Sequence, residues 1–209
     1  MPFASLVLHL TSLYLVPANF TTIPSSNLSC RIYEILPFAQ RECGACLAFA
    51  FATAASMHLC LRAGEDRIPS PFRLFDCTGR RCRDEEGPKT STVLAALAHG
   101  VGDVRDSHHL YGLPCAPDAN GSVAVTANWL NLRSHIKAAL FLTGLPLIGE
   151  VDGLIAGGDG VYSGVPSDNK HALVLLGWGD GHWIVQNSWG EAWGDGGGEL
   201  RILFSGVVE

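Results

Sequence analysis

Hydrophobic and polar positions follow different patterns in the two parts of this 209-residue chain. The apolar stretch 46–59 has no glycine or proline before Gly64, which predicts a long buried helix. Residues 90–99 begin with Thr and Ser and end before Gly100, the start and stop signals of a second helix. Apolar residues recur at helical spacing over 128–142, so we expect a third helix there.

Beyond Leu147 the pattern changes to short apolar runs separated by glycines. Such runs predict the strands of a curled antiparallel sheet. We expect these strands at residues 147–151, 160–164, 171–178, 182–189 and 199–204. A mainly helical first part and a mainly β second part predict an α+β fold.

Composition narrows the class of protein further. Hydrophobic residues make up 47% of the chain and charged ones 16%, which is enough for one globular unit or two lobes that share an interface. The net charge of −6 argues against nucleic acid or an anionic membrane as the main partner. The histidines that follow no catalytic pattern, and the pair Cys30 and Cys43, show no metal-ligand spacing, so we expect no metal and no cofactor.

Seven cysteines are an odd number. One free thiol and three disulfides would account for them, and that arrangement indicates an oxidising compartment, either outside the cell or in a lysosome-like vesicle. The sequons at Asn19, Asn27 and Asn120 agree with a secreted glycoprotein. Residues 1–16 are apolar and too short to span a membrane, and they are interpreted either as a cleaved signal or as an N-terminal remnant.

Cys46 stands at the first turn of the first predicted helix. The positive end of a helix dipole stabilises an anion, so we expect a thiol pKa well below the ~8.5 of free cysteine. A nearby base would turn this thiol into a nucleophile.

Three motifs carry a family resemblance. Residues 43–46, CGAC, resemble the C-G-[SA]-C-[WY] signature of papain and cathepsin peptidases, although Leu47 departs from its aromatic position. The segments NKHALVLLGWG around His171 and WIVQNSWGEAWGDGGG around Asn187 follow in the family's order. The start near Pro17 is similar to that of mature cathepsin B-type enzymes. The chain thus resembles papain-like cysteine peptidases, cathepsin B-type enzymes most of all.

The resemblance implies a role for each motif. Cys46 would attack a peptide carbonyl and form a thioester, with His171 as general base and then general acid. Asn187 would orient the imidazole, and Trp189 would shield their bond from water. Gln40 and the backbone N–H of Cys46 would form the oxyanion hole. The implied partners are peptide or protein substrates, bound by a monomer in the cleft of a two-lobed papain-like fold.

The resemblance also implies the disulfide pairs and the lobe boundaries. Its pairs are Cys30–Cys60, Cys43–Cys82 and Cys77–Cys115. After Cys82 the family has Asn-Gly-Gly, which grips extended substrate through its backbone, whereas this chain has RDEEGPK and retains only Gly87 for that contact. The peptidase domain would cover 17–209, with a helical lobe over about 17–125 and a β-rich, barrel-like lobe over about 126–209.

Two other functions are open to these residues. Leu47, the altered stretch after Cys82 and the lack of a propeptide-length segment before the domain would also fit a catalytically weak or inactive binding module. Cys43 and Cys46 could instead form the redox pair of a thiol–disulfide oxidoreductase, with Cys43 attacking. The redox function leaves Gln40 and His171 unexplained, so we expect a peptidase. Endopeptidase and exopeptidase action are both left open.

Overall fold

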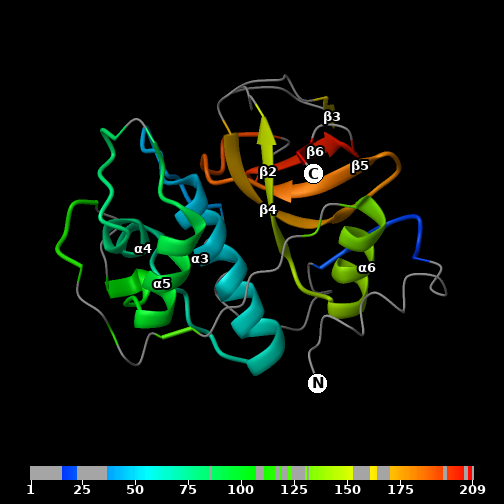
Figure 1. Ribbon diagram of the computed structural model, residues 1–209. Helices are drawn as coiled ribbons and strands as arrows, with labels where there is room; N and C mark the ends of the chain where they lie inside the picture. The colour runs from blue at the N-terminus through cyan, green and yellow to red at the C-terminus, as the bar shows by residue number, and fades with distance from the viewer. Residues whose placement is uncertain are drawn as a thin grey trace.

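The structure is a computed structural model, and it describes residues 16–22, 37–84, 86–106, 111–115, 118, 122–123, 130, 132–152, 161–163, 170–194, 197–204 and 207–208. One side of the molecule is helical, and the other holds the strands and the helix α6 (Arg133–Thr143), with the helix α3 (Cys46–His58) lying between the two sides (Figure 1). We call residues 37–123 the helical half. Residues 16–22 together with 130–208 are called the strand half.

The helices are α3 (Cys46–His58), the π-helical turn η1 (Leu59–Ala63), α4 (Pro71–Cys77), α5 (Thr90–His99), the 3-10 turn η2 (Val104–Asp106) and α6 (Arg133–Thr143). The first two form one rod that ends at Gly64, whose φ of +65° suits a residue without a Cβ. The Ser70 side chain accepts a hydrogen bond from the Arg73 N–H and caps α4. The helix expected over 128–142 begins only at Arg133, because Leu132 is extended.

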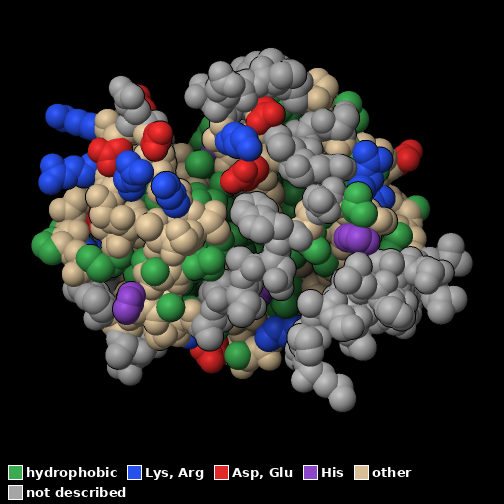
Figure 2. Space-filling model, in the orientation of Figure 1, with side chains coloured by type: hydrophobic (Ala, Val, Ile, Leu, Met, Phe, Trp, Pro, Cys, Tyr) green, Lys and Arg blue, Asp and Glu red, His purple; other side chains and the backbone are tan. Residues whose placement is uncertain are grey.

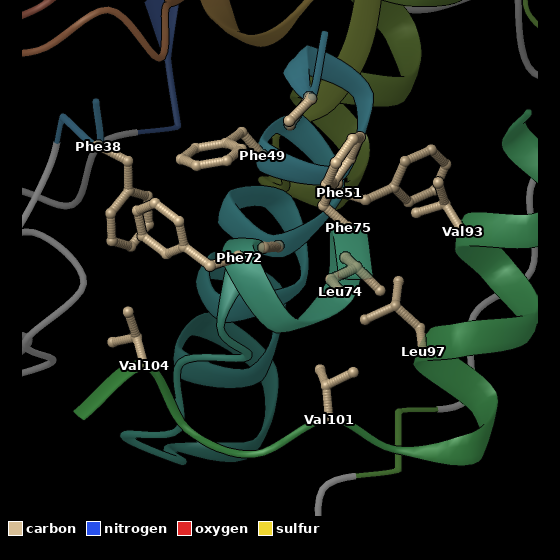
Figure 3. Packing of buried hydrophobic residues seen from close by; sticks show 14 of the residues in the cluster. Phe38, Phe49, Phe51, Phe72, Leu74, Phe75, Val93, Leu97, Val101 and Val104 are labelled. Carbon is tan, nitrogen blue, oxygen red and sulfur yellow. The ribbon is translucent and has the colours of Figure 1, made fainter. Parts of the chain in front are cut away.

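Aromatic side chains fill the helical half (Figure 3). The ring of Phe49 on α3 lies edge-on to Phe72 on α4 at 5.1 Å and to Phe38 at 6.1 Å between ring centroids. Ten consecutive residues of α3, from Ala48 to Met57, are buried, so the helix is covered on all sides. Elements of both halves therefore pack against this helix.

Burial also explains one ambiguous feature of α3. The stretch Cys46–Ala63 is long and apolar enough to cross a membrane by length and composition alone. In the structure 61% of it is buried inside the protein, and α3 packs against β4, α4 and α5. Its hydrophobicity is therefore accounted for by the core.

The strands are β1 (Phe20–Thr21), β2 (Leu147–Asp152), β3 (Val161–Tyr162), β4 (Lys170–Trp178), β5 (His182–Gln186), β6 (Glu199–Leu203) and β7 (Val207–Val208). They form one sheet in the order β3-β6-β5-β4-β2-β7, with β1 also paired to β4. Every strand pair is antiparallel except β3 and β6, which are parallel, so the expectation of a purely antiparallel sheet was wrong at that edge. The α+β fold is confirmed, while the barrel-like closure stays a prediction.

The N-terminal residues belong to the strand half rather than to the helical lobe expected over 17–125. Phe20 pairs with Trp178 in the sheet, and its ring lies 5.1 Å from that indole and 5.5 Å from the ring of Phe141 on α6. The Trp178 indole N–H donates to the Pro17 carbonyl at 3.1 Å. Packing of Phe20 against the buried Trp178 explains why this segment lies on the sheet before the chain crosses to the helices. The boundary near residue 125 stays a prediction.

Candidate active site

Cys46 is the first residue of α3 and the free cysteine of the described residues. The disulfide Cys43–Cys82 fixes the chain just before it, and the buried Ala45 precedes it. The backbone N–H of Ala172 on β4 interacts with the Cys46 sulfur. The thiol therefore lies where the helical half meets the strand that carries His171.

Burial raises the pKa of the Cys46 thiol. The N–H groups of Ala172 and Leu47 oppose this effect, and the negative charge of Glu150 adds to it. The expectation of a strongly lowered thiol pKa was wrong, because the loss of hydration outweighs the helix N-terminus. A thiolate at this position thus depends on a base that takes the proton.

His171 is the second residue of β4, is largely buried, and contacts Asn187 just beyond β5. The imidazole Nε2 lies 2.6 Å from Asn187 Oδ1. The same oxygen accepts the backbone N–H of Ser188 at 2.8 Å, which identifies it as the amide oxygen. Nε2 must then be the donor to Asn187, so the neutral imidazole carries its proton there and keeps Nδ1 free as a base.

Burial also lowers the pKa of His171, while the bond to Asn187 opposes the shift. For each of the two groups, burial thus disfavours the charged form. The buried Asn187 Nδ2 has no hydrogen-bond partner within the described part of the chain, so Asn187 acts through its oxygen alone.

Trp189 lies against the catalytic pair, as the resemblance implies. Its ring centroid is 4.8 Å from that of His171, and Trp193 packs edge-on behind it at 5.0 Å. The Trp189 indole thus covers one side of the imidazole, and Trp193 supports that indole. Such shielding strengthens the hydrogen bond between His171 and Asn187.

Gln40 is buried and is joined to the strand half by two hydrogen bonds to one residue. Its backbone N–H donates to the Ser188 carbonyl at 2.8 Å, and its Oε1 accepts the Ser188 hydroxyl at 2.5 Å. Its Nε2 donates to the Cys43 carbonyl at 2.8 Å. One N–H of the amide remains for an oxyanion next to Cys46.

Gly87 is exposed and lies beside Gly44, two residues before the thiol. A Cβ on Gly87 would be only 2.9 Å from the Gly44 carbonyl oxygen, so a side chain there would require the backbone to shift. Although the loop after Cys82 differs from the family pattern, it thus places a glycine at the edge of the site. Whether it grips substrate is untested.

The disulfides Cys43–Cys82 and Cys77–Cys115 are two of the three pairs that the resemblance implies. Cys60 is also disulfide-bonded. Cys30 lies outside the described residues, so its pairing with Cys60 stays a prediction. The three sequons can be followed only at Asn19, which is exposed, because Asn27 and Asn120 lie outside the described residues too.

Two residues that support the site were missed from the sequence. Ser188 links Asn187 to Gln40, and its place inside QNSWG was the available signal. The Tyr111 hydroxyl donates to the Gln40 carbonyl at 2.9 Å, and its ring packs on Phe72 and Phe75. Nothing in the sequence around Tyr111 indicates this contact.

Comparisons with known proteins agree with the geometry. The sequence model of the papain family cysteine proteases matches residues 151–202. A cysteine protease of Blomia tropicalis is 28% identical over 205 residues, which is 87% of this chain and 60% of that protein. Cathepsin K of Mus musculus is 29% identical over 175 residues, which is 76% of this chain and 53% of that protein.

The procathepsin B S9 structure from Trypanosoma congolense superposes with a TM-score of 0.72 at 21% identity, covering 97% of this chain and 76% of that one. In sequence and fold this chain is similar to papain-family cysteine peptidases. It spans little more than half the length of the two curated relatives. The matches include cathepsin K as well as procathepsin B, so the cathepsin B subgroup stays a prediction.

Proposed function

We propose that this chain is a papain-family cysteine peptidase that cleaves peptide bonds through a Cys46 thioester. The observation that carries the proposal is the buried chain of contacts that joins His171, Asn187, Ser188 and Gln40 beside a free thiol. These contacts hold an imidazole with Nδ1 unprotonated and an amide with one N–H to spare. A thiol-dependent acyl transfer needs both groups.

The reaction would proceed in two halves. The thiol proton passes to His171 Nδ1 as the sulfur attacks the substrate carbonyl, and the resulting oxyanion accepts hydrogen bonds from Gln40 Nε2 and the Cys46 N–H. The imidazolium then protonates the leaving amine. Water, activated by the neutral imidazole, hydrolyses the thioester and releases the thiol.

The structure weighs against the redox alternative. Cys43 would have to attack as a free thiol, yet it is bonded to Cys82. An inactive binding module is the stronger competitor, because Leu47 and the loop after Cys82 differ from the family pattern. An inactive binding module would not need the buried hydrogen bonds between Gln40 and Ser188.

The disulfides support the proposal that the protein works in an oxidising compartment, outside the cell or in a lysosome-like vesicle. Its partners would be peptides or proteins, and we propose that it acts as a monomer without cofactor, nucleic acid or membrane.

The proposal is tested with a peptidyl epoxide that alkylates activated thiols, with the labelled residue mapped by mass spectrometry. We expect labelling at Cys46, lost in His171→Ala and retained in a control, His182→Ala, whose imidazole is on the first residue of β5 and interacts with the Asp180 carbonyl. A folded protein without labelling would favour the binding module. Labelling at Cys43 would overturn the peptidase function.

A further inference from the structure

Glu150 is a charged residue of β2 that lies close enough to the proposed nucleophile for its charge to act on the thiol. It pairs directly with Ala172 on β4, and residues opposite each other in an antiparallel pair share one face of the sheet. Ala172 belongs to the core of the helical half, against which Cys46 also packs. Glu150 therefore lies on the face of the sheet that carries α3 and the thiol.

A second carboxylate shares this face. Asp152 is two residues further along β2 and pairs with Lys170, the residue before His171. Its Oδ1 atom is buried and has no hydrogen-bond partner in the described part of the chain. A buried acceptor of this kind is costly unless a donor reaches it.

Lys170 only partly offsets the two carboxylates. Its Nζ is 3.9 Å from Glu150 Oε2, and its side chain is 58% exposed, whereas that of Glu150 is 31% exposed. A long, exposed ion pair contributes little to stability, so another cation can replace the lysine. In Figure 2 basic and acidic side chains lie together beside the hollow between the two halves.

The geometry points to a cation-selecting subsite: Glu150, assisted by Asp152, binds a Lys or Arg side chain of the peptide substrate next to the bond that Cys46 attacks. This inference rests on the proposed peptidase function and names its substrate class. A guanidinium or ammonium group would donate charge-assisted hydrogen bonds to the Glu150 carboxylate and displace Lys170. The weak ion pair between Lys170 and Glu150 would thus be replaced by an ion pair between Glu150 and the substrate.

The subsite also couples substrate binding to the nucleophile. The Glu150 charge contributes to the raised pKa of the Cys46 thiol. A bound cation would offset that charge and make the thiolate easier to form. A substrate with a cationic side chain would thus gain in reaction rate as well as in binding.

The first experiment measures the charge at the sulfur without any peptide cleavage. Rates of Cys46 modification are compared for a cationic and an anionic methanethiosulfonate reagent in the intact protein. We expect the cation to react faster and the ratio of the two rates to fall severalfold in Glu150→Gln. Glu65→Gln is the matched control, because Glu65 follows η1 at the opposite end of the α3 rod. An unchanged ratio in Glu150→Gln would overturn the subsite.

The second experiment uses fluorogenic peptides that differ only in Arg, Gln or Glu beside the scissile bond. We expect a kcat/KM ratio of Arg to Gln of about tenfold or more in the wild type, approaching one in Glu150→Gln but not in Glu65→Gln. Charge-selective modification without this preference would overturn cation selection. Charge-selective modification without any peptide cleavage would overturn the peptidase function and leave only an anionic site.

Discussion

The two halves of the molecule hold their share of the site by different means. The helical half presents Cys46 at the end of a fully buried helix, braced by the disulfides Cys43–Cys82 and Cys77–Cys115. The strand half presents His171 from a sheet, and hydrogen bonds set its orientation. The nucleophile is thus positioned by covalent bracing and packing, and the base by a network of polar contacts. Perturbations of these supports should therefore have different consequences.

The largest expected effect is the loss of the nucleophile. Cys46→Ala should abolish peptide turnover, whereas the thermal midpoint should stay within a few degrees, because the substitution removes one thiol group from a partly buried position. Turnover and thermal unfolding are measured on the same preparation. Extensive unfolding of the variant would mean that Cys46 is structural.

The covalent bracing is tested by removing one disulfide. The double variant Cys77→Ser, Cys115→Ser should lose roughly 2–4 kcal/mol in the free energy of unfolding, measured by urea denaturation followed by far-ultraviolet circular dichroism. The bond closes a loop between residues 38 apart, which the unfolded chain would otherwise explore freely. An unchanged free energy of unfolding would mean that this disulfide does not brace the helical half.

The polar network is tested at its shared member. Ser188→Ala removes the hydroxyl that donates to the buried Gln40 Oε1, and it keeps the backbone N–H that orients Asn187. Leaving a buried acceptor unsatisfied costs about 1–3 kcal/mol, so kcat should fall about tenfold while KM changes little. Tyr111→Phe is the milder companion, because it removes only a hydrogen bond to the Gln40 backbone. An unchanged kcat in Ser188→Ala would remove Gln40 from the oxyanion role.

The smallest expected effect concerns pH. Burial lowers the pKa of His171, so the folded state binds its proton less readily than the unfolded state does. Stability from this group is present above the ordinary histidine pKa of about 6.5 and is lost as the pH falls below it. The thermal midpoint of His171→Gln should therefore depend less on pH between about 7 and 5 than that of the wild type.

His58→Gln is the comparison for that measurement, because burial lowers the pKa of His58 in the same direction, while its bond to the Pro146 carbonyl opposes the shift. A wild-type midpoint that rises on acidification, and does so only with His171 present, would mean that the folded state holds a protonated imidazole instead.

Local signals explain what the sequence could predict. The helix over 90–99 and the long strand β4 were predicted nearly to the residue. Gly100 marks the end of the helix, and an unbroken apolar run marks the strand. The strands β1 and β7 were missed, since two residues have no pattern and form only by pairing with β4 and β2.

The chemistry of the site divides in the same way. The candidate residues came from short motifs, but the bond between Ser188 and Gln40 joins positions 148 residues apart, and no local pattern indicates it. The thiol pKa was mispredicted because a helix N-terminus is visible in sequence, whereas burial by distant segments such as β4 is not.

The sheet closes over a long interval of the chain, since β1 pairs with β4 and the whole helical half lies between them. During synthesis Cys46 emerges about 125 residues before His171, so at ~5–20 residues per second the growing chain would carry the thiol for roughly 6–25 s without its base. For that interval α3 has no β4 to pack on, and Phe20 has no Trp178. The nascent protein would thus hold a cysteine that cannot yet catalyse peptide cleavage. Its thiol would be available first for oxidation or for the wrong disulfide, and only later for catalysis.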